Sequence, residues 1–376
     1  MAVVGLCAAL STLAIAGRAE TQEQSALPVA ADPVASHSTN DAGRPPSAPT
    51  ALRAAGYASL PFRELICPVA NEDTQTHGPS LVELANGDLL AVWNARKGRG
   101  LDTEIRGARR PAGAQAWTAP VVIHDTPNVP DTNPVLYVGR TGTVRVFWAV
   151  EEPASFGQDE ERLHGRVSED GGQTWGSAYD LGAPGQLLPR THPIRLDNGW
   201  VLFPLYFDWS ASAVTMTSLD DGATWGQLRY ILPLLGTQPT LMQRSDGSVF
   251  ALMRTGMWPR RSWQAVSRNF GKSWGRHRLS KLRNPGSSLD MVRLRSGRVA
   301  LVFNDSKTDR ANLSVALSED GGATWPYVKA IEQSPGQEHG YPSIIQDRQG
   351  LIHVVYSHNQ RTSIAHVVVD EDWIMQ

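Results

Sequence analysis

A glycine turn followed by a short apolar strand recurs six times along this chain at nearly constant spacing. The copies include NGDLLAVW, TGTVRVFW and QGLIHVVY, and successive glycines lie 55, 57, 48, 50 and 53 residues apart. A period of this size, carried by short β-branched and aromatic strands, is typical of four-stranded propeller blades. The glycines are Gly87, Gly142, Gly199, Gly247, Gly297 and Gly350. The sequence therefore predicts an all-β fold, a six-bladed β-propeller.

A second repeat interleaves with the first and has the same period. It reads SEDGGQTW in its first copy, and its copies begin at Ser168, Ser218, Ser267 and Ser318. In such a box an Asp or Asn side chain can accept hydrogen bonds from turn N–H groups, and the glycine takes a positive φ. The tryptophan can pack against the blade. We interpret the boxes as hairpins of the scaffold between outer strands rather than as sugar-stacking sites.

A proline precedes most of the glycine turns at the start of the strand before them. This position needs no ladder hydrogen bond, and near-continuous apolar runs indicate strands that are covered on both faces. The strands are therefore expected to be the inner strands of the blades. We expect the residues just before the prolines to meet at one end of the propeller, around its central axis. The prolines are Pro79, Pro134, Pro193, Pro239 and Pro342.

The chain divides into three predicted parts. Residues 1–19 are apolar and rich in small residues, and they end near Gly17-Arg18-Ala19, which indicates an export signal. Residues 20–59 are rich in Ala, Ser and Pro and are expected to be a disordered linker. Residues 60–376 are expected to form the propeller. A secreted or periplasmic location follows from the predicted signal.

Charge and motif content exclude several classes of partner. The formal net charge is −2 with both signs mixed along the chain, so no basic stripe for nucleic acid or anionic lipid is present. No later segment is apolar for long enough to span a bilayer. No spacing of Cys or His indicates zinc, and no glycine loop suits a phosphate, so no metal or cofactor is expected. We expect a monomer that binds a small neutral or anionic ligand in a local pocket.

The boxes resemble the Asp-box of the sialidase (neuraminidase) family, and the chain resembles a bacterial sialidase-type six-bladed propeller over nearly all of its ordered length. Asp-boxes also occur in unrelated hydrolases, lyases and binding propellers, so the site residues must decide the function. The resemblance implies three arginines that bind the substrate carboxylate, a tyrosine nucleophile activated by a glutamate, and an aspartate acid/base. A planar guanidinium matches a carboxylate with two parallel hydrogen bonds, which a lysine cannot do.

Three positions match this family pattern. Arg254 ends the strand SVFALMR and matches the second arginine, and Arg310 in TDRANLSVALSEDGG matches the third. Tyr341 in EHGYPSII matches the nucleophile. A neutral tyrosine suits an anionic sugar because a carboxylate nucleophile would be repelled.

Two positions depart from the pattern. His77 in THGPS stands where the resemblance implies the first arginine, and Arg63 in FREL is the second choice for that arginine. Gln238 stands sixteen residues before Arg254, where the resemblance implies the glutamate, and an amide cannot take a proton. His77 or His339 is a candidate to replace that glutamate, because neutral imidazole can act as a base near pH 7.

The remaining candidates come from loops and strand starts at the same end. Asp102 in RGLDTEIRGARR is expected to be the acid/base, with Glu104 as the substitute. Asn133, His192 and Asp290 are expected to line the pocket. A loop carboxylate can also be merely solvated, and a histidine at a strand end often makes only structural hydrogen bonds.

Together these features predict an exo-glycosidase that hydrolyses a terminal acidic sugar from a glycan. Tyr341 would attack the anomeric carbon, Asp102 would protonate the leaving oxygen, and Arg254 and Arg310 would bind the carboxylate. Two alternatives stay open. One is a lyase that acts on uronate-containing glycans, and the other is an inactive carbohydrate-binding propeller that keeps two arginines for recognition.

Overall fold

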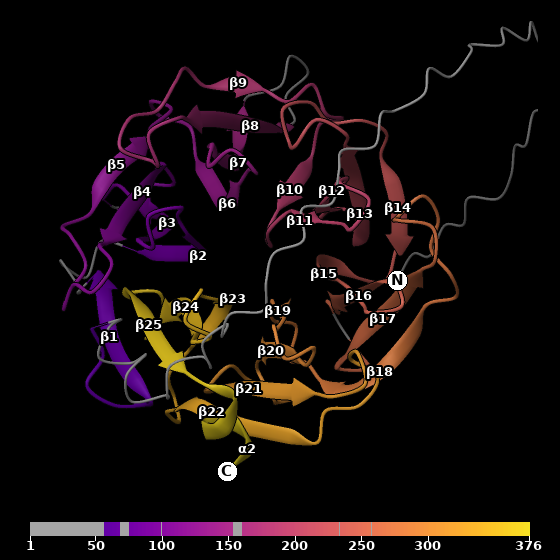
Figure 1. The fold of residues 1–376 in the computed structure, drawn as a ribbon. Helices are drawn as coiled ribbons and strands as arrows, with labels where there is room; N and C mark the ends of the chain where they lie inside the picture. Colours follow the sequence, from indigo (N-terminus) through magenta and orange to yellow (C-terminus); the bar gives the residue numbers. More distant parts are fainter. Residues whose placement is uncertain (1–55, 68–74, 99, 153–159, 233, 257) are drawn as a thin grey trace, which may run out of the picture. The chain divides into compact units, whose positions relative to one another are not determined.

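The computed structural model describes residues 56–376 except 68–74, 99, 153–159, 233 and 257, all within one compact unit (Figure 1). Six antiparallel sheets stand around a central axis in this unit, which confirms the predicted six-bladed propeller. The expected export signal and nearly all of the expected linker lie outside the described residues. The helix in the described part, α2 (Glu371–Met375), falls short of the length and hydrophobicity that a membrane crossing requires.

The first three blades follow one another along the chain. Blade one consists of β2 (Thr76–Glu83), β3 (Leu89–Arg96), β4 (Thr103–Arg110) and β5 (Val121–His124). Blade two consists of β6 (Asp131–Val138), β7 (Val144–Glu152), β8 (Glu160–Ser168) and β9 (Tyr179–Asp180). Blade three consists of β10 (Leu187–Pro189), β11 (Ile194–Arg195), β12 (Val201–Phe207), β13 (Ser212–Ser218) and β14 (Arg229–Leu232).

The last blade is completed by a strand from the other end of the chain. Blade four consists of β15 (Thr237–Gln243), β16 (Val249–Arg254), β17 (Arg261–Ser267) and β18 (Arg278–Arg283). Blade five consists of β19 (Asp290–Arg293), β20 (Val299–Phe303), β21 (Asn312–Ser318) and β22 (Tyr327–Gln333). Blade six consists of β23 (Gly340–Gln346), β24 (Ile352–His358), β25 (Ser363–Val369) and β1 (Phe62–Cys67). Because β1 pairs with β25, the ring closes through backbone hydrogen bonds.

The hydrophobic core lies between neighbouring blades. Val92 of blade one and Val146 of blade two, both fully buried, belong to one cluster, and equivalent clusters join the other neighbouring blades. Inner strands are therefore covered on both faces, as their apolar runs predict. This packing fixes the strands and leaves the loops at the two ends to carry a site.

The Asp-boxes form hairpins between the last two strands of blades two to five. In the second box, Asp220 Oδ1 accepts hydrogen bonds from Ser218 Oγ at 2.7 Å and from the Thr224 N–H at 2.8 Å. The Gly222 N–H donates to Ser218 Oγ at 2.7 Å. Trp225 packs into the core cluster between blades two and three. These contacts confirm that the boxes belong to the scaffold.

Four inner strands share a distortion before their proline. The strands begin two or three residues before the proline rather than at it, and the pairing register shifts there. The residue before the proline takes a left-handed backbone in each, at Gly78 (φ 61°), Asn133 (φ 51°), Gln238 (φ 48°) and Tyr341 (φ 53°). In blade three the inner strand is instead interrupted between β10 and β11, at residues 190–193. We call the end of the propeller where these residues lie the mouth.

Candidate functional site

Tyr341 lies at the centre of the residues that gather at the mouth. Its hydroxyl oxygen accepts a hydrogen bond from Nη1 of Arg254, the last residue of β16, at 3.2 Å. The same Nη1 donates to Oε1 of Gln238 at 3.1 Å. The hydrogen bonds of Arg254 thus go to two neutral groups, and the structure brings these three predicted residues together.

Three further guanidinium groups surround the ring of Tyr341. The Cζ atoms of Arg190, Arg310 and Arg361 lie 5.5, 5.2 and 5.8 Å from the ring centroid. We call Arg190, Arg254, Arg310 and Arg361 the arginine cup. Burial raises the pKa of Tyr341, but the positive charges of Arg254, Arg310 and Arg361 outweigh it and lower that pKa below its ordinary value. The cup therefore favours a negative charge at its centre.

A glutamate joins two members of the cup. Glu338 Oε1 accepts from Arg310 Nη1 at 2.7 Å and from Arg361 Nη2 at 3.4 Å. Burial acts to raise the pKa of Glu338, but the positive charges of Arg310 and Arg361 outweigh it, and the pKa lies below its ordinary value. The carboxylate is therefore ionised at neutral pH. One carboxylate facing these guanidiniums leaves the cup with net positive charge, which suits an anionic ligand.

His77 packs edge-on against the ring of Tyr341. The two ring centroids are 4.0 Å apart at an interplanar angle of 62°, and His77 Nδ1 lies 3.1 Å from Ser357 Oγ. Burial, together with the positive charges of the arginine cup, holds the pKa of His77 well below its ordinary value. The imidazole is therefore neutral at pH 7, and the same effects make it a weak base.

Two amides share the hydroxyl of Tyr206. Nδ2 of Asn133 and Nε2 of Gln238 each donate to this oxygen at 3.3 Å. The phenol is 3 % exposed, and burial raises its pKa above the ordinary value, so it stays protonated. Asn133 and Gln238 are thus held in fixed orientations beside the cup.

His192 and Asp290 take part in contacts that join the inner strands of different blades. Asp290 is 2 % exposed and accepts hydrogen bonds from Thr240 Oγ1 at 2.8 Å and from the Ile344 N–H at 3.1 Å. His192 Nε2 lies 3.6 Å from Asp290 Oδ2 and 3.1 Å from Ser343 Oγ. Both residues, predicted to bind substrate, therefore have structural partners in β15 and β23.

The predicted acid lies in the loop between β3 and β4, at the mouth end of blade one. Asp102 Oδ2 pairs with Lys97 Nζ at 2.8 Å, and that nitrogen also binds Asp125 Oδ1 at 2.6 Å. Oδ1 of Asp102 is buried and has no hydrogen-bond partner among the described residues. The substitute candidate, Glu104, is buried in β4 and pairs with Arg106 at 2.5 Å. Glu104 is thus engaged in an ion pair inside blade one.

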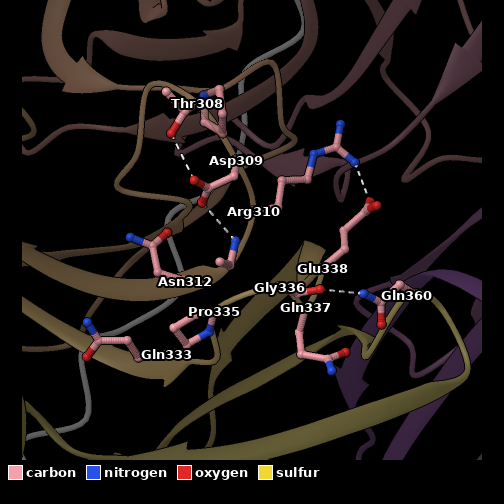
Figure 2. Close-up of a pocket in the computed structure, with 12 residues that line it drawn as sticks. Thr308, Asp309, Arg310, Asn312, Gln333, Pro335, Gly336, Gln337, Glu338 and Gln360 are labelled. Atoms are coloured by element: carbon pink, nitrogen blue, oxygen red, sulfur yellow. Dashed lines mark hydrogen bonds and ion pairs between the residues drawn. The ribbon is translucent and has the colours of Figure 1, made fainter.

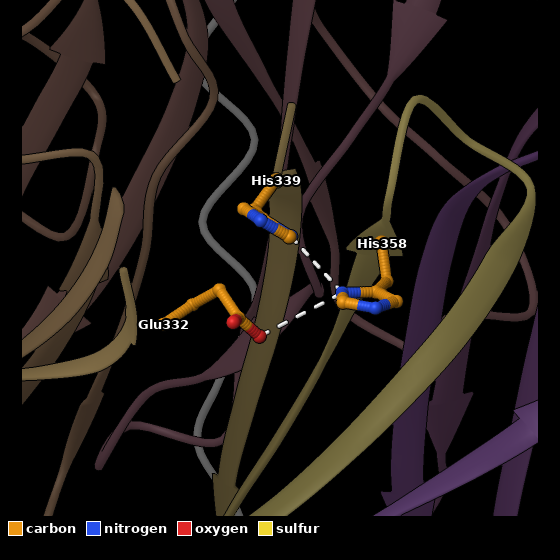
Figure 3. A group of neighbouring side chains, drawn as sticks. All are labelled: Glu332, His339 and His358. Atoms are coloured by element: carbon orange, nitrogen blue, oxygen red, sulfur yellow. Dashed lines mark hydrogen bonds and ion pairs between the residues drawn. The ribbon is translucent and has the colours of Figure 1, made fainter. Parts of the chain in front are cut away.

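A group of three potential metal ligands lies beside the cup, although the sequence predicts no metal (Figure 3). Ligand atoms of Glu332, His339 and His358 all lie within 4.8 Å of one another, and the Nδ1 atoms of the two histidines are 3.0 Å apart. Arg63 Nη2 lies 2.5 Å from Glu332 Oε2 and 3.3 Å from His358 Nδ1. The guanidinium therefore already supplies the positive charge that a cation would bring. Arg63, the second choice for the first arginine, thus contacts this group.

Four residues of the site have no place in the sequence prediction. Arg190 shares the segment PRTHP with His192, and Tyr206 ends the strand copy NGWVLFPLY, so both had a signal in the repeat. Glu338 and Arg361 lie in loops outside any repeated pattern. Arg361 ends a run of three left-handed residues, with φ of 49°, 50° and 67° at positions 359–361. Such strained backbone is concentrated at functional sites.

Comparison with known proteins identifies the same architecture. The family described as BNR repeat-like domain matches residues 87–354. A sialidase of Bacteroides fragilis is 23 % identical over 338 residues, covering 77 % of this chain and 60 % of the relative. A sialidase of Micromonospora viridifaciens is 26 % identical over 299 residues, covering 68 % of this chain and 46 % of the relative. This chain thus spans about half of the length of these curated relatives.

Among solved structures, the Hadza microbial sialidase Hz136 superposes with a TM-score of 0.71 at 19 % identity. The match covers 83 % of this chain and 69 % of that one. A likeness at this level of identity establishes the fold and leaves the chemistry to the site residues.

Proposed function

We propose that this chain hydrolyses a terminal acidic sugar from a glycan. It belongs to the family of BNR repeat-like domains and is a sialidase-like propeller. The observation that carries the proposal is the arginine cup around Tyr341, with Arg254 Nη1 at 3.2 Å from the phenol oxygen. The guanidinium groups can bind an anionic sugar, and the phenol among them can attack it.

The substrate carboxylate is bound by the cup. Among the described residues, Arg254 donates to neutral groups, and Arg310 and Arg361 share one carboxylate, Glu338. An incoming carboxylate gains charge-assisted hydrogen bonds from these groups without breaking a strong ion pair of Arg254. His77 stands where the resemblance implies an arginine in blade one. The Arg361 carbonyl accepts from the Thr76 N–H at 2.7 Å, so the backbone of Arg361 is tied to the start of the strand that carries His77.

Tyr341 is the nucleophile of the proposed reaction. Its oxygen forms a bond to the anomeric carbon while the bond from that carbon to the leaving oxygen breaks. Asp102 gives the leaving oxygen a proton, which requires that its carboxyl is protonated in the complex instead of ion-paired with Lys97 Nζ. Water then displaces the tyrosine and releases the acidic sugar. Gln238 cannot act as a base, so the phenol proton passes to the neutral imidazole of His77. The lowered pKa of Tyr341 favours this transfer, whereas the pKa of His77, held well below its ordinary value, opposes it.

The test compares wild type with Tyr341→Phe on aryl glycosides of sialic acid and of glucuronic acid. We expect wild type to release the aryl group from one of them, and the variant to lose turnover by on the order of 10³-fold or more while still binding the sugar. Measurable sugar binding by wild type without turnover of either glycoside would contradict hydrolysis and favour a binding propeller.

A second candidate is elimination from a uronate-containing glycan. It is favoured by one observation, that neutral His77 and Tyr341 lie edge to face at 4.0 Å while Gln238 stands where a glutamate would act. A base at this place would remove the proton beside the carboxylate and expel the neighbouring sugar, leaving a double bond in the product. Ultraviolet absorbance of that double bond, together with release of no hydrolysed acid sugar, identifies this reaction.

A further inference from the structure

The outer half of blade four carries a concentration of positive charge. Residues 247–289 contain nine Arg and Lys side chains and no Asp or Glu, in a chain whose formal net charge is −2. The expected mixing of both signs along the chain therefore fails at this blade. Seven of the nine side chains are exposed and lie on β17, on β18 or in the hairpin between these two strands, which are the outer strands of the blade (Figure 1). They are Arg261, Arg268, Lys272, Arg276, Arg278, Lys281 and Arg283.

Most of these cations have no carboxylate partner. Arg283 pairs with Asp305 at 2.6 Å, and the other six form no ion pair with a described residue. Arg261 and Arg283 stand opposite each other in the register of β17 and β18. Like charges in this arrangement destabilise a strand pair. A surface that keeps so many cations without neutralising them indicates an anionic partner.

A groove of about 570 Å³ lies beside these cations, between the outer strands of blades four and five. Lys281 and Arg283 line it together with the amide of Gln264 and the ring of Trp325. Trp325 is partly buried and packs against the core cluster between the two blades, so its ring is held in place. Cations, an amide and an aromatic ring in one groove suit a sugar unit that carries an acidic group.

The groove is separate from the site at the mouth. The pocket beside the arginine cup contains the ion pair of Arg310 and Glu338, which Figure 2 shows. No described residue lines both cavities. The groove carries a net charge of +1 from Lys281, Arg283 and Asp305. A ligand on blade four would therefore be bound by residues that the proposed reaction does not use.

We propose that the outer face of blade four and the neighbouring groove bind an anionic polysaccharide. This binding goes beyond the proposed hydrolysis and does not depend on it. A polysaccharide with repeated carboxylate or sulfate groups can contact several of the cations at once while one of its sugar units occupies the groove. The groove favours this ligand over a bilayer surface or a DNA duplex, because neither inserts a unit of this size between two blades.

The first test measures binding of the full chain to heparin and to polygalacturonate by calorimetry, with neutral dextran as the control polymer. We expect both polyanions to bind at low salt and to lose affinity by about 10-fold or more at high salt, because salt screens exposed charges. Dextran should not bind. A short DNA duplex and vesicles of phosphatidylglycerol are measured alongside, and tighter binding of either would overturn the assignment to a polysaccharide.

The second test changes the groove and the cations. Val328, 45 % exposed, lines the groove, and Val122, 53 % exposed, lies on the outermost strand of blade one. We expect Val328→Glu to weaken both polyanions by about 10-fold through charge repulsion, and Val122→Glu to leave them unchanged. Arg278→Ala combined with Lys281→Ala should weaken them by about 10-fold, the loss of two exposed charge contacts.

Arg361→Ala distinguishes this surface from the mouth, because it acts on the arginine cup. We expect it to leave the affinity for both polyanions unchanged. Loss of their binding in Arg361→Ala would place the polymers at the mouth and overturn the proposal. Equal affinities of Val328→Glu and Val122→Glu, or failure of wild type to bind either polyanion, would overturn it as well.

Discussion

Charges from three other parts of the chain lower the pKa of the Tyr341 hydroxyl. Burial alone disfavours the phenolate, but Arg254, Arg310 and Arg361 together reverse the effect, and the pKa falls below the ordinary value of 10.0. The sign follows from linkage, because cations stabilise the deprotonated form and so shift ionisation to lower pH. Other buried tyrosines have raised pKa values, namely Tyr57, Tyr137, Tyr206 and Tyr356. Tyr341 therefore ionises before these four as the pH rises.

Ultraviolet titration of the phenols tests this assignment. We expect Tyr341→Phe to lack the transition at lowest pH, and Arg361→Ala to shift that transition to higher pH because one neighbouring cation is gone. Arg298→Ala is the matched control, since Arg298 pairs with Glu319 and Glu371 at the opposite end. An unchanged first transition in Tyr341→Phe would show that another phenol produces it.

At the scale of the strand, the mouth is made by a repeated bulge before proline. Gly78, Asn133, Gln238 and Tyr341 all take left-handed φ values there, although three of them are not glycine. The register shift in each strand takes the side chains of Asn133, Gln238 and Tyr341 out of the regular alternation between the two faces of the sheet. Asn133 and Gln238 then donate to Tyr206, and Tyr341 accepts from Arg254. A left-handed residue with a side chain is strained, and the surrounding contacts must hold it.

Substitutions at Asn133 measure this strain. Because a β-branched residue fits a left-handed backbone poorly, Asn133→Val should be less stable than Asn133→Gly by about 1–3 kcal/mol in urea unfolding. Thr132, which has an ordinary φ in the same strand, provides the control. There the order reverses, with Thr132→Gly less stable than Thr132→Val by about 0.5–1 kcal/mol. The same order at both positions would rule out backbone strain as the cause.

At the scale of the whole molecule, the site exists because the ring is closed. β1 adds the fourth strand to blade six, and Ile66, 3 % exposed, packs into the cluster between blades six and one. The cup takes its arginines from blades three to six, and His77 comes from blade one. Loss of closure would therefore separate His77 from Tyr341.

Ile66→Ala tests the contribution of the closing strand. Removal of a buried isoleucine side chain should lower the free energy of unfolding by about 2–5 kcal/mol, measured by denaturant unfolding. Leu65→Ala, at a neighbouring side chain that is 43 % exposed, should change it by no more than about 0.5 kcal/mol. Equal losses at the two positions would show that closure does not depend on burial at this interface.

The sequence by itself determined the number of blades, the inner hairpins and the Asp-boxes, because these depend on local periodicity and turn chemistry that each repeat carries. It also indicated Tyr341, Arg254, Gln238 and His77, whose places are tied to strand starts or strand ends of the repeat. Arg361 and Glu338 lie in loops of no repeated pattern, and Arg190 contacts the strand starts of blades one and six from blade three. Only the tertiary structure decided their positions, because side chains from loops converge through ring closure, which depends on contacts between residues distant in the chain.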